Sequence, residues 1–106
     1  DVMALRVRVC ALDDVADGEL RAFPVAGVTW PVIVTRIAGE LVAVPGVCPH
    51  EDVPLATGEL RGHAIVCAGH GYAFDVRTGR CQHDPALELR RYPIIVVDGD
   101  VWVDLL

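Results

Sequence analysis

The stretches Cys48-Pro49-His50 and Cys67-Ala68-Gly69-His70 are separated by sixteen residues in a chain of 106. Each stretch offers one thiolate sulfur and one imidazole nitrogen, and both atoms are common metal ligands. If each stretch lies on a loop and the two loops face each other, four ligands surround one site. The pattern therefore predicts a metal centre, and the grouping of the ligands narrows the choice of metal.

The grouping favours an iron–sulfur cluster over zinc. A zinc finger of the Cys2His2 type takes Cys with Cys from one loop and His with His from another. Here each loop supplies one of each, which suits a [2Fe–2S] cluster in which one iron binds both sulfurs and the other both imidazoles. The alternative is a zinc-stabilised β interaction module without a redox role. Absorbance separates the two, because a zinc protein is colourless.

Two further cysteines need their own interpretation. The segment Cys81-Gln82-His83 repeats the Cys-x-His spacing and is a rival for the first ligand pair, but it lacks a proline-rich flank and follows the second pair closely. Cys10 ends an alternating segment and is predicted to be a buried thiol that packs as a small hydrophobic group. His63 is expected at the solvent-exposed start of a strand.

Composition limits the possible functions. The net charge of −6 argues against nucleic acid, whose phosphates require clusters of Lys and Arg. No apolar run approaches the roughly 18 residues of a membrane span. The first residues lack a secretory pattern, so we expect a cytoplasmic protein whose cysteines bind metal rather than form disulfides. The length predicts a single domain, residues 1–106.

Short apolar segments with turn residues between them predict an all-β sandwich or barrel. Pro24 and Pro31 are expected to restrict their strands to edges or bulges. The clearest hairpin has Asp98-Gly99-Asp100 as its turn. Both Cys/His pairs then fall on loops between strands. The expected strands are Leu5–Val9, Leu20–Val25, Val28–Ile37, Leu41–Val44, His63–Val66, Ile94–Val97 and Val101–Val103.

The two ligand pairs, followed by the segment Gly71–Gly79, resemble the Rieske [2Fe–2S] proteins. The resemblance covers nearly the whole chain and includes Asp84-Pro85-Ala86-Leu87, which is similar to the family's proline loop over the cluster. It is nearest to the ferredoxins of bacterial aromatic-ring oxygenases, and among them to those of toluene monooxygenases. The implied fold is a Rieske-like antiparallel β-sandwich with two cluster-binding loops at one tip.

The resemblance also implies ligands and partners. Cys48, His50, Cys67 and His70 would bind one Rieske-type cluster, and the protein would be a one-electron carrier rather than an enzyme. Its partners would be a flavin-containing NAD(P)H reductase and a terminal oxygenase, either a di-iron monooxygenase or a ring-hydroxylating dioxygenase. Both would dock transiently at the His50/His70 tip of a monomer.

Differences from other Rieske proteins imply a low reduction potential. Respiratory members join their two cluster loops by a disulfide, and the matching positions here are Val53 and Gly69. They also carry a serine that donates a hydrogen bond to a cluster sulfur, where this chain has Tyr72. Two ferric irons, two sulfides and two thiolates sum to zero charge when the other ligands are neutral imidazoles, so the oxidised cluster is neutral and the added electron makes it negative. Fewer hydrogen bonds to the sulfurs leave the added electron less stabilised, which lowers the potential.

Overall fold

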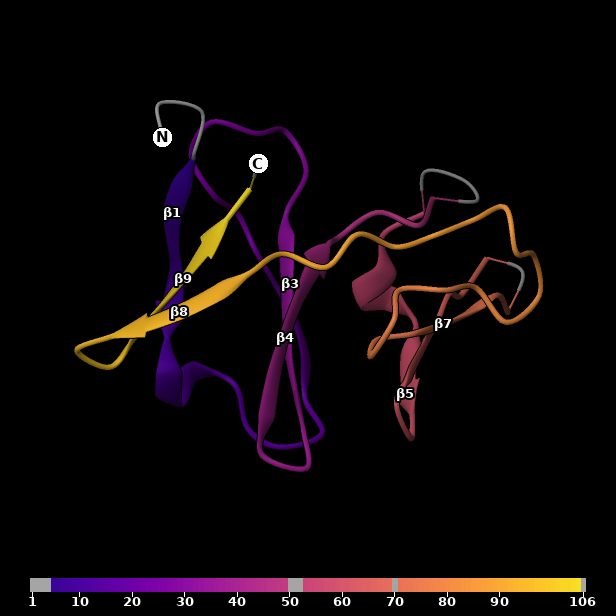
Figure 1. Ribbon diagram of the computed structural model, residues 1–106, viewed down its shortest axis with the longest axis horizontal. Coiled ribbons are helices and arrows are strands. Elements are labelled where there is room, and N and C mark those ends of the chain that lie inside the picture. The colour runs from indigo at the N-terminus through magenta and orange to yellow at the C-terminus, as the bar shows by residue number, and fades with distance from the viewer. Residues whose placement is uncertain (1–4, 50–52, 70, 106) are drawn as a thin grey trace.

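The computed structural model describes residues 5–49, 53–69 and 71–105, and in this part of the chain the regular structure is three antiparallel sheets and two short 3-10 helices (Figure 1). This confirms the predicted all-β class. The first sheet has the order β1 (Arg6–Ala11), β9 (Asp100–Asp104), β8 (Ile94–Val97). The second has β2 (Leu20–Phe23), β3 (Val32–Ile37), β4 (Glu40–Pro45), and the third has β5 (Glu59–Arg61), β6 (Ala64–Val66), β7 (Ala73–Asp75). The helices are η1 (Leu12–Asp14) and η2 (Leu55–Thr57).

The second sheet is the middle layer of the fold, with β3 and β4 between the other two sheets (Figure 1). Alternate residues of a strand point to opposite faces. Val32 and Val34 of β3 therefore pack into a core shared with β1 and β9, whereas Ile33 packs into the core that the third sheet covers. Because both faces are buried there, β3 begins with an uninterrupted apolar run at residues 32–34 instead of an alternating pattern.

The expected position of one strand was wrong. Val28–Ile37 was predicted to lie at a sheet edge or contain a bulge, but β3 begins only at Val32 and is the central strand of its sheet. Pro31 lies just before it, so the missing proline N–H interrupts no ladder. The expectation holds for the strand before Pro24, since β2 is an edge strand.

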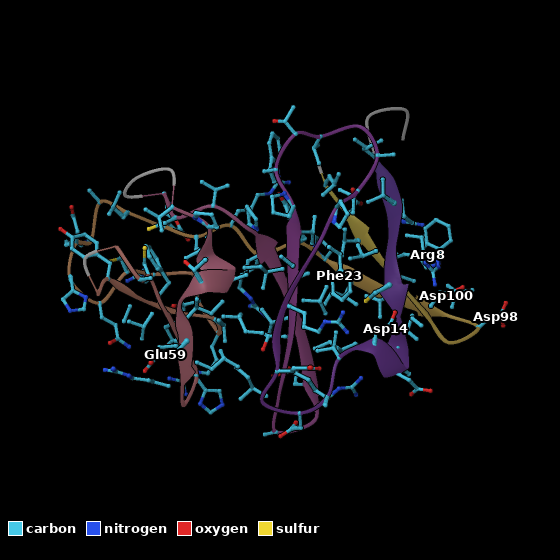
Figure 2. All side chains as sticks on the ribbon, turned by 180° about the vertical axis from the view of Figure 1, so that it is seen from behind. Arg8, Asp14, Phe23, Glu59, Asp98 and Asp100 are labelled. Atoms are coloured by element: carbon cyan, nitrogen blue, oxygen red, sulfur yellow. The ribbon has the colours of Figure 1, made fainter. Side chains whose placement is uncertain are left out.

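The first sheet closes the fold opposite the third sheet. The predicted hairpin is confirmed as β8 and β9, with a two-residue turn in which both Asp98 and Gly99 have positive φ. Asp98 lies at the tip of this hairpin, and Arg8 of β1 forms an ion pair of 3.0 Å with Asp100 at the start of β9 (Figure 2). The acidic segment after β1 begins in η1.

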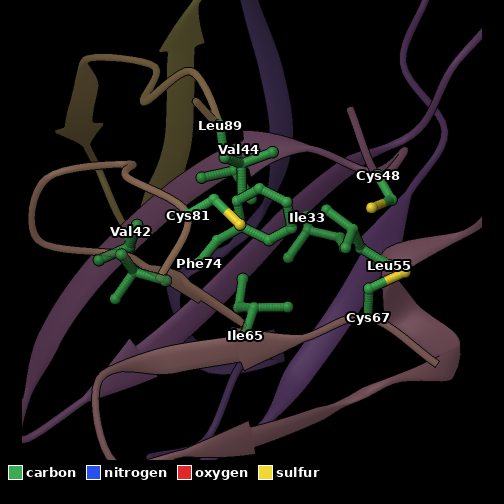
Figure 3. Packing of buried hydrophobic residues seen from close by; sticks show 11 residues of the cluster. Ile33, Val42, Val44, Cys48, Leu55, Ile65, Cys67, Phe74, Cys81 and Leu89 are labelled. Carbon is green, nitrogen blue, oxygen red and sulfur yellow. The ribbon is translucent and has the colours of Figure 1, made fainter. Parts of the chain in front are cut away.

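The hydrophobic core under the third sheet extends to Cys48 and Cys67. Phe74 of β7 and Ile65 of β6 are fully buried against Ile33 and Val44 (Figure 3). The strands β5 and β7 were not predicted, because three residues are too few to show an alternating pattern. β6 was expected from its apolar run and is confirmed.

The turn after β7 is held by an ion pair with a measurable pH dependence. Hydrogen bonds from the Arg77 guanidinium (2.9 and 3.1 Å) and from its backbone N–H (2.8 Å) lower the pKa of Asp75 to about 2. An aspartate carboxyl ordinarily has a pKa of about 4. The pair therefore stabilises the folded state fully above about pH 4. That contribution is lost as pH falls through the folded pKa.

We expect Asp75→Asn to lower the free energy of unfolding at pH 7 by at most about 1 kcal/mol, because Arg77 is exposed and the pair is screened. Urea unfolding checks the size. Carbon-13 titration of the Asp75 carboxyl checks the cause, and a midpoint near pH 4 would contradict it.

Candidate metal centre

Cys48 lies on a loop whose base is closed by backbone contacts. The N–H of Cys48 donates to Val53 O at 3.0 Å. Val47, the residue before Cys48, and Pro54, the residue after Val53, form an antiparallel β-bridge. Gly46 begins this loop, and a Cβ there would lie 2.7 Å from Pro31 Cγ and 2.9 Å from Pro31 O. The close approach lets the Gly46 N–H donate to Pro31 O at 2.8 Å. The loop is therefore anchored to the start of β3.

Cys67 follows β6 directly and begins the second loop. Its N–H donates to Tyr72 O at 2.8 Å, and its carbonyl accepts from the Gly71 N–H at 3.0 Å. Gly71 has a φ of +71°, a backbone conformation that residues other than glycine rarely adopt. The Gly69 N–H lies 3.5 Å from Cys67 Sγ and points at it. A backbone donor of this kind stabilises a thiolate more than a neutral thiol.

The side chains of Cys48 and Cys67 belong to the same buried hydrophobic core. Cys48 and Cys67 are each 1% exposed and pack with Leu55, which is fully buried (Figure 3). Val53 and Tyr72 cover this cluster as partly buried neighbours. The prediction that both cysteines lie on loops between strands is confirmed. Their predicted partners His50 and His70 lie outside the described residues.

These surroundings fit the group that the sequence predicts. Two sulfur donors, shielded from water by apolar side chains and held by short closed loops, suit a buried iron that takes both thiolates. Within the described residues no three Cys, His, Asp or Glu side chains gather as a metal site.

The remaining cysteines have other roles. Cys10 lies in the core between the first two sheets, 2% exposed, which confirms its prediction as a small buried hydrophobic group. Burial, and then the nearby Asp14 carboxylate, raise the pKa of its thiol. Cys81 packs beside Phe74, apart from Cys48 and Cys67 in the close view (Figure 3). All four cysteines are described, and none of them forms a disulfide.

Sequence reasoning missed the role of His83. The structure places its ring against Tyr72, and its Nδ1 accepts a hydrogen bond from the Ala73 N–H. A count along the hairpin would have found this contact. The turn at Thr78-Gly79 pairs Phe74 with Cys81, and two steps further the same register brings residue 72 opposite residue 83. His63 is exposed, as predicted.

Comparison with protein families matches residues 6–93 to the Rieske [2Fe-2S] domain. The chain belongs to the Rieske family. The match spans both loops described above and the strands that carry them. Its cofactor is a Rieske-type [2Fe–2S] cluster, so the zinc alternative is set aside.

Three relatives illustrate the similarity. The ferredoxin component of biphenyl 2,3-dioxygenase from Rhodococcus jostii (strain RHA1) is 35% identical, over 97% of this chain and 94% of that protein. The ferredoxin component of the alkene monooxygenase system from Xanthobacter autotrophicus is 33% identical, over 92% and 79%. The solved complex of reduced oxygenase and oxidised ferredoxin in carbazole 1,9a-dioxygenase contains a chain 32% identical with a TM-score of 0.82, over 93% and 92%.

These relatives confirm the Rieske ferredoxin fold that the sequence predicted. They include ferredoxins of both dioxygenase and monooxygenase systems. Among the described residues, no helix is long and apolar enough to cross a membrane.

Proposed function

We propose that this Rieske protein is the ferredoxin component of a multicomponent oxygenase system, carrying one electron at a time to a terminal oxygenase. The observation that carries the proposal is the pair Cys48 and Cys67, buried in one cluster at the bases of two closed loops. They sit in a chain that aligns over nearly its full length with oxygenase ferredoxins. The protein is an electron carrier and not the catalyst of the system.

The chain's own residues prepare the site for electron transfer. When bound, the cluster supplies a one-electron acceptor and donor. Leu55, Val53 and Tyr72 keep water from the thiolates, and the Gly69 N–H offsets negative charge on Cys67 Sγ. The backbone bonds that close both loops hold the sulfurs in one geometry. A site that changes little between oxidation states needs little reorganisation when an electron arrives.

The finer proposals concern ligands and partners. We propose that Cys48, His50, Cys67 and His70 bind the cluster, the thiolates on one iron and the imidazoles on the other. The electron donor would be a flavin-containing NAD(P)H reductase. Reductase and oxygenase, either a di-iron monooxygenase or a ring-hydroxylating dioxygenase, would dock in turn at the His50/His70 tip. Residues 1–106 would act as one monomeric domain in the cytoplasm.

Spectroscopy and reconstitution test this function together. After reduction by dithionite, the EPR spectrum should show an average g value below that of an all-thiolate cluster, because nitrogen ligands lower it. With NAD(P)H, a flavin reductase and either oxygenase type, product should form only when the ferredoxin is present. Isolation without air of a protein lacking iron and acid-labile sulfide would refute the proposal, and so would product formation at equal rate without it.

A further inference from the structure

The segment after the β7 turn runs back alongside β7 and places His83 against the second cluster loop. Phe74 pairs antiparallel with Cys81, and the Gln82 N–H donates to Ala73 O at 2.8 Å. The ring of His83 then stacks on the ring of Tyr72, with 5.5 Å between centroids and 15° between planes. The Ala73 N–H donates to His83 Nδ1 at 3.3 Å.

The stacking on Tyr72 and the hydrogen bond to Nδ1 fix the position of the His83 ring. Because Nδ1 accepts a hydrogen bond, the neutral ring carries its proton on Nε2. The His83 N–H also donates to Cys81 Sγ at 3.4 Å, which fixes the backbone beneath the ring. Cys81 is itself buried in the core cluster. The imidazole is therefore held from its backbone and from Nδ1 in a stacked position.

Tyr72 connects His83 to a cluster ligand. Its side chain packs against the hydrophobic core that contains Cys67, and its ring stacks on the ring of His83. Its carbonyl accepts the hydrogen bond from the Cys67 N–H at 2.8 Å. The loop between Cys67 and Tyr72 contains Gly69 and Gly71, which restrict the backbone least of all residues. Contacts from outside such a loop therefore add to the backbone bonds that close it.

We propose that His83 is a positioning residue for the second cluster loop: its ring and Nδ1 hold Tyr72 and Ala73 in place and thereby limit the access of water to the cluster. This inference rests on the proposed function, since it assigns His83 to the electron-carrying site. The Cys81-Gln82-His83 segment thus supports the ligand loop instead of replacing a ligand pair.

Three variants separate the two contacts. His83→Ala removes both, His83→Phe retains a ring for stacking, and His83→Asn retains an acceptor near the position of Nδ1. We expect the visible absorbance of the cluster in air to decay about threefold to tenfold faster in His83→Ala, from the worth of one stacked pair and one hydrogen bond. Each of the other variants should restore part of the parent lifetime.

The reduction potential supplies a readout that a purely structural role would not move. The reduced cluster carries one more negative charge than the neutral oxidised one, and water stabilises the charged state more. Greater access of water in His83→Ala should therefore raise the potential, with the other two variants between it and the parent. His63→Ala is the matched control, because His63 is exposed on the turn between β5 and β6 and should change neither quantity.

An unchanged potential and lifetime in His83→Ala would overturn the inference, as would equal changes in His63→Ala. Failure of this inference is distinguishable from failure of the proposed function. If the parent protein binds the cluster and supports product formation while His83→Ala behaves like it, only the role of His83 is refuted. A parent without a cluster would refute the function itself.

Discussion

Replacing either Cys48 or Cys67 by alanine is expected to abolish cluster binding and all electron transfer. In the proposed ligand set each thiolate is one of the two cysteine ligands of a single iron, while Cys10 packs in the other core and Cys81 packs beside Phe74. Iron and acid-labile sulfide per chain should fall to nearly zero, and the visible absorbance should disappear. The free energy of unfolding should also fall by several kcal/mol, because a group that binds only the folded state stabilises it.

Cys10→Ala provides the matched control. Cys10 is nearly as buried as Cys48 and Cys67, at 2% exposure, but it packs in the other core. We expect this variant to retain its full iron and sulfide content, with a stability loss on the order of 1 kcal/mol for the sulfur removed from the core. Retention of the parent iron content in Cys48→Ala or Cys67→Ala would refute the assignment of these thiolates.

Gly58→Ala is expected to have the second largest effect. Gly58 ends η2, and a Cβ built on it would lie 1.9 Å from the carbonyl oxygen of Val66. That carbonyl belongs to β6, one residue before Cys67, so the overlap can be relieved only by moving backbone next to this proposed ligand. We expect a loss of about 3 kcal/mol or more, and a fall in Tm on the order of 15 °C. Cluster content should decrease as well.

Gly62→Ala separates this overlap from the general cost of replacing glycine. Gly62 has a φ of +59°, and no heavy atom lies within 4 Å of the position of its Cβ. Its substitution should cost only the strain of a left-handed residue, about 1 kcal/mol, with no effect on iron content. Thermal unfolding and iron assays of both variants test the argument. Equal losses in the two would show that the contact with Val66 is not the cause.

The chemistry of the site was predictable because it depends on residue types and short spacings. Cys67 directly follows the predicted strand His63–Val66, and Cys48 comes four residues after the predicted strand Leu41–Val44, so their position on loops followed from the strand pattern. The sequence made Cys81 a weaker candidate because it lacks a proline-rich flank and follows the second pair closely, and the choice of ligands stays a prediction. In the structure His83, two residues after Cys81, contacts Tyr72 and Ala73. The low potential argued from Tyr72 stays a prediction.

Parts of the fold were less accessible. The strands β5 and β7 are three residues long, and a pattern of period two is not recognisable over that length. The central position of β3 was missed because Pro31 suggested an edge. A strand buried on both faces has the same apolar run whether a helix or a second sheet covers it, so its place in the sheet depends on partners distant in the chain.

The all-β class and the Rieske family could be recognised from residue order alone, because hydrophobic pattern and motif spacing are local properties. Three contacts could be read only from the folded chain: Cys48 and Cys67 lie in one core and Cys10 in the other, Gly58 faces Val66, and the His83 ring stacks on Tyr72 of the second loop. These contacts join segments that pack together only after the sheets have formed. Their geometry depends on backbone positions to within about an ångström, which residue order alone does not specify.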